Sequence, residues 1–252
     1  MTIGVIGAMP EEVALLARDL EGARSERRGT RDYLRGRLQG RDAVVVFSGW
    51  GKVASTSTAT TLIEVFGVDS VVFTGVAGAL APDLAVGDVV IGAELLQHDL
   101  DASAVPGIAR YEVPLLGVSR FRSDARLVRL ARAAAGRYLT ERLAADVGEE
   151  HLREFGLHNP AVRTGLIVSG DQFISSAARV AEILADLPDA LCVEMEGAAV
   201  AQVCFEHGVP FVVLRAISDR ADHAAPVDFP RFLRTVASHL TCGVVMGLMA
   251  AL

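Results

Sequence analysis

Five acidic residues stand where apolar segments of the chain begin or end. Glu11 and Glu12 follow the apolar run TIGVIG. Glu194 and Glu196 flank a methionine in LCVEMEG, and Asp219 follows PFVVLRAIS. A carboxylate beside such segments is costly to bury unless it is paired or hydrogen-bonded. These positions therefore indicate either a structural partner or a chemical use.

These carboxyl groups suit different tasks in the cleavage of a bond to a sugar. Glu12, turned back over residues 7–9 from a helix start, can hold and deprotonate a water. Asp219, kept protonated by an apolar site, can donate a proton to a leaving group. Glu194 and Glu196 together can accept hydrogen bonds from the two hydroxyls of a vicinal diol such as ribose.

The same residues also have structural interpretations, which stay open at this point. Glu11 and Glu12 in a first helical turn would compensate the helix dipole. Asp219 would serve as a helix N-cap or as the partner of Arg215.

Other chemistries find little support in the sequence. The six histidines show no metal-ligand spacing, and His98-Asp99 with Asp101 is the nearest approach to a ligand cluster. The glycine-rich turns TGVAGAL and SGWGK do not match the known phosphate-binding patterns. No Ser-His-Asp pattern or nucleophile elbow occurs. We expect neither a metal nor an organic cofactor.

Apolar runs and helical patterns alternate along the chain. The predicted strands are 2–7, 43–49, 70–75, 88–96, 163–170, 191–195 and 210–218. The predicted helices are 11–20, 53–66, 125–138, 177–187, 196–206 and 229–252. This alternation predicts one α/β domain, 1–252, a three-layer α/β/α sandwich with a central mixed, mostly parallel sheet. Ligand sites of such sheets lie at the carboxyl ends of strands, so the acidic residues should converge there.

Composition limits the partners and the compartment. The net charge is −7 and no Lys/Arg block stands out, so we expect no nucleic-acid partner. No apolar run reaches the roughly 18 to 20 residues of a membrane span. Cys192, Cys204 and Cys242 lie in apolar runs and indicate buried, reduced thiols in a cytoplasmic protein. Residues 139–162 are polar and should form a surface excursion, helical in part.

Taken together, the motifs resemble a known family. They are IGVIGAMPEEV, SGWGKV, TGVAGAL, VGDVVI, LIVSGDQFI, VEMEGAAVA and PFVVLRAISDRAD, in that order over nearly the whole chain. The sequence resembles the nucleoside phosphorylase/nucleosidase superfamily and, within it, bacterial 5′-methylthioadenosine/S-adenosylhomocysteine nucleosidases. The resemblance implies a phosphorylase-like fold, a homodimer, and hydrolysis of an adenine thioribonucleoside to adenine and a 5-thioribose sugar.

The resemblance also implies roles for matching positions. Glu12 would activate the water and Asp219 would protonate or hydrogen-bond adenine N7, while Glu196 would hold the ribose hydroxyls. The remaining substrate-binding positions that it implies are Met9 and Met195 at the sugar, Phe173 and Ile174 at the base, Phe229 over the 5′ side, and Glu194, Arg215 and Ser218 as supporting groups.

Hydrolysis and phosphorolysis are distinguished by charge. The related phosphorylases hold phosphate with arginines near the first glycine turn and at the end of the strand before the second glycine turn. Here the first turn carries Glu11 and Glu12. The predicted strand 70–75, which leads into the turn TGVAGAL, ends in FTGV without Arg or Ser at the matching places. A carboxylate repels a phosphate dianion but can act as a base toward water. Asp219, where 6-oxopurine phosphorylases usually carry Asn, favours adenine.

Two residues depart from the family pattern. Val76 replaces a small hydroxyl residue, and Trp50, the only tryptophan, replaces a small or aliphatic one. Trp50 is either a wedge in the core or an interface, or a side chain that reshapes the pocket for the 5′-substituent. We expect a partner subunit to complete that pocket through residues 99–118, with Tyr111 as the candidate.

Three alternatives remain open from the sequence. They are a purine nucleoside phosphorylase, a nucleosidase for another 5′-modified adenine nucleoside such as an aminofutalosine-type substrate, and a non-catalytic nucleoside-binding protein. The joint presence of Glu12, Glu196 and Asp219 disfavours the last, because binding alone requires neither a base nor an acid.

Overall fold

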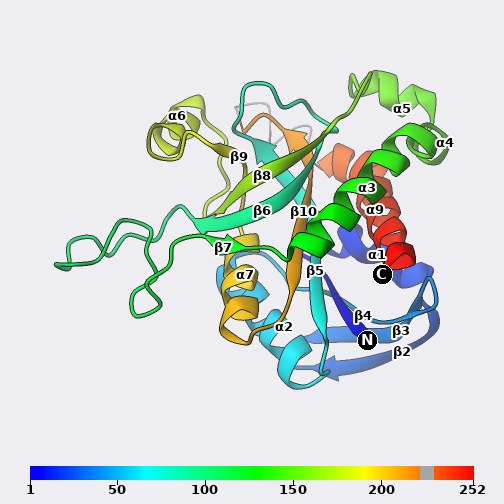
Figure 1. Ribbon diagram of the computed structural model, residues 1–252. Coiled ribbons are helices and arrows are strands. Elements are labelled where there is room, and N and C mark those ends of the chain that lie inside the picture. The colour runs from blue at the N-terminus through cyan, green and yellow to red at the C-terminus, as the bar shows by residue number, and fades with distance from the viewer. Residues whose placement is uncertain (222–229) are drawn as a thin grey trace.

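The computed structural model describes residues 1–221 and 230–252, and in these residues one ten-stranded sheet forms the centre of the fold (Figure 1). Its strands are β1 (Thr2–Gly7), β2 (Glu21–Arg28), β3 (Arg31–Leu38), β4 (Arg41–Phe47), β5 (Ser70–Ala79), β6 (Val89–Gln97), β7 (Phe121–Arg122), β8 (Val162–Ser169), β9 (Ala190–Glu194) and β10 (Phe211–Asp219). Each predicted strand is present, within about two residues at most ends, and β5 runs on to Ala79.

The sheet is mixed, as predicted. The strand order is β10-β6-β8-β9-β5-β1-β4-β3-β2, and β10 also pairs with β5. The first five strands of this order therefore close a ring, and the others extend from β5 as an open sheet. The strands form two parallel sets, β1, β4, β5 and β10 in one and β6, β8 and β9 in the other. The two sets run antiparallel to each other at the β6–β10 and β5–β9 pairs.

Helices cover both faces of the sheet, which confirms the three-layer α/β/α sandwich. The helices are α1 (Pro10–Arg18), α2 (Lys52–Glu64), α3 (Ala125–Glu141), α4 (Leu143–Val147), α5 (Glu149–Glu154), α6 (Ala177–Asp186), α7 (Gly197–Glu206), the π-helical turn η1 (Leu233–Ala237) and α9 (Ser238–Ala251). Helices α1, α3 and α9 pack together on one face, while α2 and α7 pack together on the other (Figure 1). Each layer has its own buried apolar cluster.

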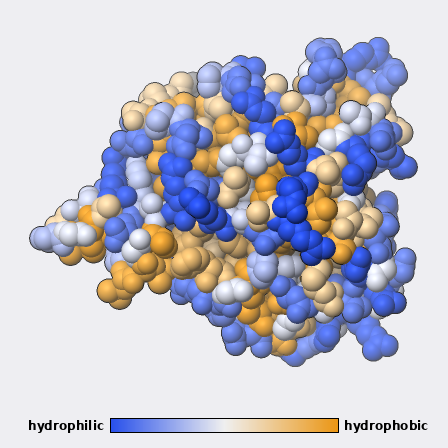
Figure 2. All heavy atoms as spheres, viewed as in Figure 1, coloured by the Kyte–Doolittle hydropathy of each residue, from blue (hydrophilic) through white to orange (hydrophobic). Residues whose placement is uncertain are grey.

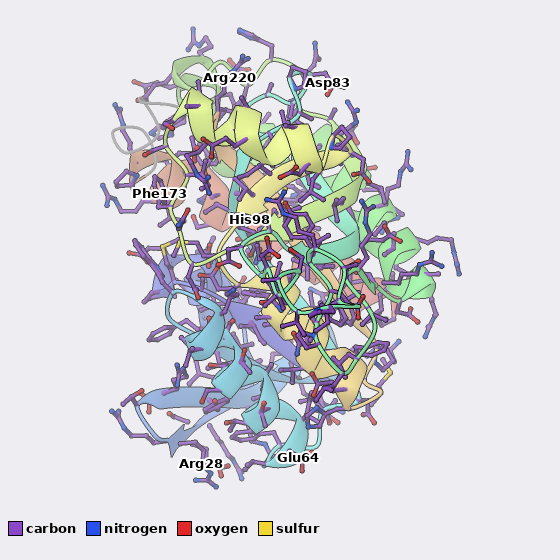
Figure 3. The ribbon with its side chains drawn as sticks, turned by 90° about the vertical axis from the view of Figure 1, so that its left-hand side faces the viewer. Arg28, Glu64, Asp83, His98, Phe173 and Arg220 are labelled. Atoms are coloured by element: carbon purple, nitrogen blue, oxygen red, sulfur yellow. The ribbon has the colours of Figure 1, made fainter. Side chains whose placement is uncertain are left out.

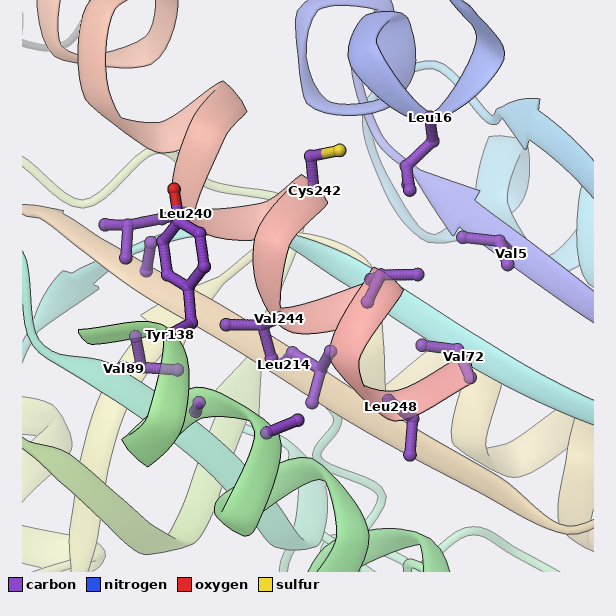
Figure 4. Close-up of a cluster of buried hydrophobic side chains, with 14 of the residues drawn as sticks. Val5, Leu16, Val72, Val89, Tyr138, Leu214, Leu240, Cys242, Val244 and Leu248 are labelled. Carbon is purple, nitrogen blue, oxygen red and sulfur yellow. The ribbon is translucent and has the colours of Figure 1, made fainter. Parts of the chain in front are cut away.

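The last helix is strongly apolar and lies in the core. Among the described residues, Pro230–Ala251 is one helix that is long and apolar enough to cross a membrane by length and composition. The sequence predicts no apolar run of that length. In the structure α9 is a core helix, packed on α3 and β10 with Val244, Leu248 and Cys242 buried (Figure 4). A Cβ at Gly243 would lie 1.9 Å from the Tyr138 ring, so glycine sets the close approach of α9 to α3.

Two segments differ from the sequence-based expectation. The hairpin β2–β3 was missed, because β2 is almost wholly exposed and rich in Arg and shows no apolar run. Segment 139–162 is helical in part, as predicted, since it holds the end of α3 and all of α4 and α5. It is not only a surface excursion, because Leu143, Val147 and Leu157 are buried in the core cluster of α3 and α9.

Candidate active site

The carboxyl ends of the strands meet at one pocket, as predicted from their polar endings. The pocket is lined by Ala8, Met9, Glu12, Trp50, Val76, Ala77, Gly78, Gln172, Phe173, Ile174, Val193, Glu194, Met195, Glu196, Ser218 and Asp219. The predicted site residues are all in this lining except Arg215, which lies behind it, and Phe229, which falls outside the described residues. Segments from 8–12 to 218–219 thus come together at one end of the sheet.

Glu12 turns its carboxylate back over the start of α1. Pro10 occupies the first helical turn, where its missing N–H leaves no bond unmade. Glu12 Oε2 accepts hydrogen bonds from the N–H groups of Ala8 (2.5 Å) and Met9 (2.9 Å). Glu12 Oε1 accepts one from the N–H of Val76 (3.1 Å). The residue is 2% exposed, so its carboxylate is fixed between β1 and β5.

The environment of Glu12 favours proton exchange near neutral pH. Burial raises the pKa of Glu12 to about 7, against the opposing effects of the Arg215 charge and of the three backbone N–H groups. Gly75 allows this placement, because a Cβ there would lie only 2.7 Å from Glu12 Oε1. A buried carboxyl with a pKa near 7 is suited to general-base chemistry.

Glu194 is held by a dense set of donors behind the pocket. Its Oε2 accepts from Arg215 Nη2 at 2.5 Å and Nε at 3.2 Å, and Arg215 is 1% exposed. The Ser169 hydroxyl and the N–H groups of Glu196 and Gly197 also donate to this carboxylate. Glu194 is therefore a brace, paired with Arg215, rather than a free acceptor for ligand.

Glu196 is the more available of the two carboxylates. It precedes α7, and its Oε1 accepts a hydrogen bond of 2.7 Å from the N–H of Gly51. Burial, followed by the charge of Glu194, raises the pKa of Glu196 to about 8. Its second oxygen has no hydrogen bond to the residues that the structure describes, and Glu196 lines the pocket.

Asp219 lies at the end of β10, where the pairing with β5 is shifted. Its Oδ2 accepts from the Ser218 hydroxyl (2.7 Å) and its Oδ1 accepts from the Ala221 N–H (2.8 Å). Ser218 also donates to the Ala77 carbonyl at 3.4 Å. Asp219 is 7% exposed, so a ligand atom reaches it only through the pocket.

Two aromatic side chains stand at the rim of the pocket. Phe173 is 44% exposed and Trp50 is 59% exposed. In Figure 3, Phe173 and His98 lie between helix α6, drawn in yellow, and helix α2, drawn in cyan. Ile174, beside Phe173, is buried against the core. The exposure of Trp50 excludes the wedge in the core of this chain as an explanation for the tryptophan.

Several contributors to the site were missed by sequence reasoning. Ala8 and Gly51 donate backbone N–H groups and Ser169 holds Glu194, while Gly75 leaves room for Glu12 and Gln172 lines the pocket. The motifs SGWGK, TGVAGAL and LIVSGDQFI were the available signals, since they contain Gly51, Gly75, Ser169 and Gln172. In SGWGK, Gly49 and Gly51 adopt positive φ angles of 80° and 88°.

Tyr111 and the three cysteines lie outside the pocket lining. Tyr111 is 9% exposed and packs in the core of its own chain, with its hydroxyl donating to Asp186 at 3.1 Å. The contribution of Tyr111 and segment 99–118 to a partner's pocket stays a prediction. The three cysteines are free and buried, as predicted, and burial raises the pKa of Cys204 and Cys242 to about 12.

The part of the chain that the structure describes contains no group of three His, Cys, Asp or Glu side chains that could hold a metal ion. His98 and Asp99 are not such a group, because Asp99 is bonded to Lys52. The ionisable groups in the pocket lining are the carboxyl groups of Glu12, Glu194, Glu196 and Asp219.

The sheet and its rim of carboxylates define a class of protein. The family described as the phosphorylase superfamily matches residues 2–248. The chain belongs to this superfamily, as the motifs indicated.

Relatives narrow the class. A 5′-methylthioadenosine/S-adenosylhomocysteine nucleosidase of Actinobacillus succinogenes is 39% identical over 252 residues, which is 100% of both chains. The one of Geobacillus kaustophilus is 40% identical, over 95% of this chain and 93% of its own. The Neisseria meningitidis nucleosidase, solved with methylthio-immucillin-A, has a TM-score of 0.87 and 38% identity, covering 100% of this chain and 99% of its own. Within the superfamily, the chain groups with these nucleosidases.

Proposed function

We propose that this protein hydrolyses the N-glycosidic bond of 5′-methylthioadenosine, S-adenosylhomocysteine or both, giving adenine and a 5-thioribose sugar. The observation that carries the proposal is the placement of Glu12. It is a buried carboxyl with a pKa of about 7, held by three N–H groups in the same pocket as Glu196 and Asp219. The nucleosidase relatives, which align over nearly the whole chain, give the substrate class.

The chemistry divides between two ends of the pocket. Glu12 takes a proton from water, and the water oxygen attacks the anomeric carbon as the bond to adenine N9 breaks. Positive charge develops on the ribose and negative charge on the base. Asp219 donates a proton to N7, which neutralises the leaving group. Both groups are buried, which strengthens these interactions relative to water.

The ribose is held by the neighbouring acidic pair. Glu196 offers an oxygen to the ribose hydroxyls, because its other oxygen is already bonded to Gly51. Glu194 and Arg215 fix the backbone that carries Glu196. Met9 and Met195 shape the sugar side, while Phe173 and Ile174 contact the base.

Charge favours water over phosphate as the nucleophile. Arg215 is bonded to Glu194 and to the Leu214 carbonyl and lies behind the pocket lining. Glu12 has no direct ion pair with the residues that the structure describes, and its deprotonated carboxylate in the pocket would repel a phosphate dianion.

The decisive experiment is adenine release from methylthioadenosine, with and without phosphate. We expect equal rates in both, with the free sugar as product. Turnover that depends on phosphate would identify a phosphorylase. The absence of turnover on any adenine nucleoside would identify a binding protein. Futalosine-type substrates belong in the panel, because a Helicobacter pylori futalosine hydrolase has a TM-score of 0.84 with 33% identity.

Trp50 determines the preference at the 5′ end in this proposal. Its indole is 59% exposed at the rim of the pocket, where a bulky 5′-substituent would meet it. We expect Trp50→Ile to raise hydrolysis of S-adenosylhomocysteine relative to methylthioadenosine by about threefold or more, since about 1 kcal/mol of relieved contact suffices for this. Parallel kcat/KM measurements give the ratio, and an unchanged ratio would contradict the role.

We further propose that the protein is a homodimer, that it is cytoplasmic and that it acts in methionine salvage. A homodimer is supported by exposed apolar side chains, with Val53 82% and Leu115 105% exposed. A cytoplasmic location is supported by the three free, buried thiols. Release of adenine and a thioribose sugar fits a step of methionine salvage.

A further inference from the structure

Three loops meet in a closed ring of hydrogen bonds beside the pocket. Lys52 Nζ lies 2.6 Å from Asp99 Oδ1. Asp99 Oδ2 accepts the Asp171 N–H at 2.9 Å, and Asp171 Oδ1 accepts the Lys52 N–H at 2.8 Å. The side chains of Lys52 and Asp99 are 19% and 22% exposed, so water screens this ion pair only in part.

The ring touches the site on two sides without being part of the pocket lining. Gly51, next to Lys52, donates its N–H to Glu196 Oε1 at 2.7 Å. Asp171 begins the segment that carries Phe173 and Ile174. Asp99 stands at the root of the long segment that protrudes between β6 and β7 (Figure 1).

We propose that Asp99 is a positioning residue that holds the Gly51 N–H on Glu196 and thereby sets the carboxylate for the ribose hydroxyls. The proposal rests on the proposed function, in which Glu196 binds the ribose.

The turn that Asp99 holds, at the start of α2, depends on hydrogen bonds on both of its sides. Gly49 and Gly51 adopt positive φ angles of 80° and 88°, a conformation that glycine adopts and also leaves readily. Trp50 between them is 59% exposed, so core packing does not hold the turn. Before the turn, the Gly49 N–H donates to the Ala8 carbonyl and Arg31 donates to the Ser48 carbonyl. After it, the Ser55 N–H donates to the Gly51 carbonyl, and the bonds of Lys52 to Asp99 and Asp171 tie the turn to the loops beside the pocket.

Asp99 is suited to this task because it stays ionised. Burial acts to raise its pKa, but the hydrogen bonds from Lys52 and from the Asp171 N–H outweigh burial, and the net pKa is lowered. A neutral amide at this position would keep a weak acceptor for one partner and lose the charge that holds Lys52.

The test compares a ligand that has a ribose with one that has none. In Asp99→Asn we expect the KM for methylthioadenosine to rise about tenfold. We expect the inhibition constant of adenine, which has no hydroxyls for Glu196, to change by less than about twofold. Equal weakening of both ligands would show general disorder of the site, and no change in either would show that Asp99 positions nothing. Both results would overturn the proposal.

Asp83→Asn is the matched control. Asp83 lies in another loop, outside the pocket lining, and it forms an ion pair with Arg163. Its side chain is 58% exposed, and we expect both constants to stay within about twofold of the wild type. A tenfold rise in KM for this variant would show that the loss of any paired carboxylate has the effect.

Lys52→Met removes the same ion pair with Asp99 from the other side. It keeps the proposal testable if Asp99→Asn does not fold. The double variant should lose no more than the worse single variant, because both substitutions remove one link. Additive losses would contradict a shared link. Wild-type turnover of methylthioadenosine is measured first, so a failure of the proposed function is recognised independently of these variants.

Discussion

At the scale of single residues, one buried arginine, Arg215, lies near three buried carboxyl groups but forms an ion pair with only one of them. Glu194 takes the direct ion pair with Arg215. The charge of Arg215 acts on Glu12 and Glu196 only at a distance. Burial raises the pKa of Glu12 to about 7 and that of Glu196 to about 8. The group that is paired is structural, while the two that are left without a cation are those with protons to exchange near neutral pH.

Glu12 and Asp219 give the most direct prediction at this scale. We expect Glu12→Gln and Asp219→Asn each to lower kcat by about 100-fold or more, the usual scale for a general base or acid. Each amide keeps the size and much of the hydrogen bonding, so the fold should persist. Steady-state adenine release measures the loss, with circular dichroism as a check on folding. Near-normal turnover in either variant would remove that residue from its role.

The raised pKa of Glu12 predicts the pH dependence. A base works only when it is deprotonated, and the pKa of Glu12 is about 7. Below pH 7 we expect kcat/KM to fall about tenfold per pH unit, and above pH 7 to level off on that limb. A profile from pH 5 to pH 9 measures it. The residual activity of Glu12→Gln should lack the acid limb, and its persistence would assign the limb to another group.

Gly75 carries a prediction at the scale of the elements, because it sets how closely β5 approaches α1. A Cβ at this position would lie 2.7 Å from Glu12 Oε1 and 3.1 Å from Glu12 Cδ. We expect Gly75→Ala to displace the carboxylate from the Val76 N–H and to lower kcat by about tenfold or more. Stopped-time assays of adenine release measure this.

Gly136→Ala is the matched control for that substitution. Gly136 lies in α3, and a Cβ there meets nothing within 4 Å. The substitution should leave kcat unchanged and raise the free energy of unfolding by about 0.5 to 1 kcal/mol through helix propensity. An unchanged kcat in Gly75→Ala would show that Glu12 tolerates the displacement.

Much of the element pattern could be predicted from the sequence, for physical reasons. Strands buried on both faces, such as β1 and β5, must be continuously apolar, and a continuous apolar run is visible in the sequence. The β2–β3 hairpin is exposed and rich in Arg, so no burial pattern marks it. Its pairing depends on the turn and on β4, which are properties of the folded sheet.

The same distinction applies to the candidate site. Its acidic side chains were found because strand ends converge and because acids beside apolar runs are unusual. The donors that hold them were not found, since backbone N–H groups such as that of Gly51 have no residue signature. The ring of Lys52, Asp99 and Asp171 joins loops far apart in the chain, and only the fold brings them together.

At the scale of the whole molecule, apolar side chains remain exposed near the site. Figure 2 shows hydrophobic atoms on the segment that protrudes at the left, which Figure 1 places between β6 and β7. Val105 and Leu115 of this segment are 52% and 105% exposed, and Val53, at the start of α2, is 82% exposed. Trp50 is close to Val53 in the chain. These exposed residues are the candidates for the interface of the proposed homodimer.

The homodimer leads to a prediction that joins assembly to activity. If a second copy covers Val53 and Trp50, a charge at position 53 must be buried without a partner when the subunits associate. We expect the wild type to sediment as a dimer and Val53→Glu to sediment as a monomer, with the KM for methylthioadenosine raised about tenfold or more because the 5′ pocket is left open. Ala133→Glu adds the same charge to an exposed position of α3, on the opposite helical layer, and should stay dimeric and active. Analytical ultracentrifugation at the concentrations of the assay decides the matter: a wild type that is monomeric and fully active would exclude any role of a second copy in the site.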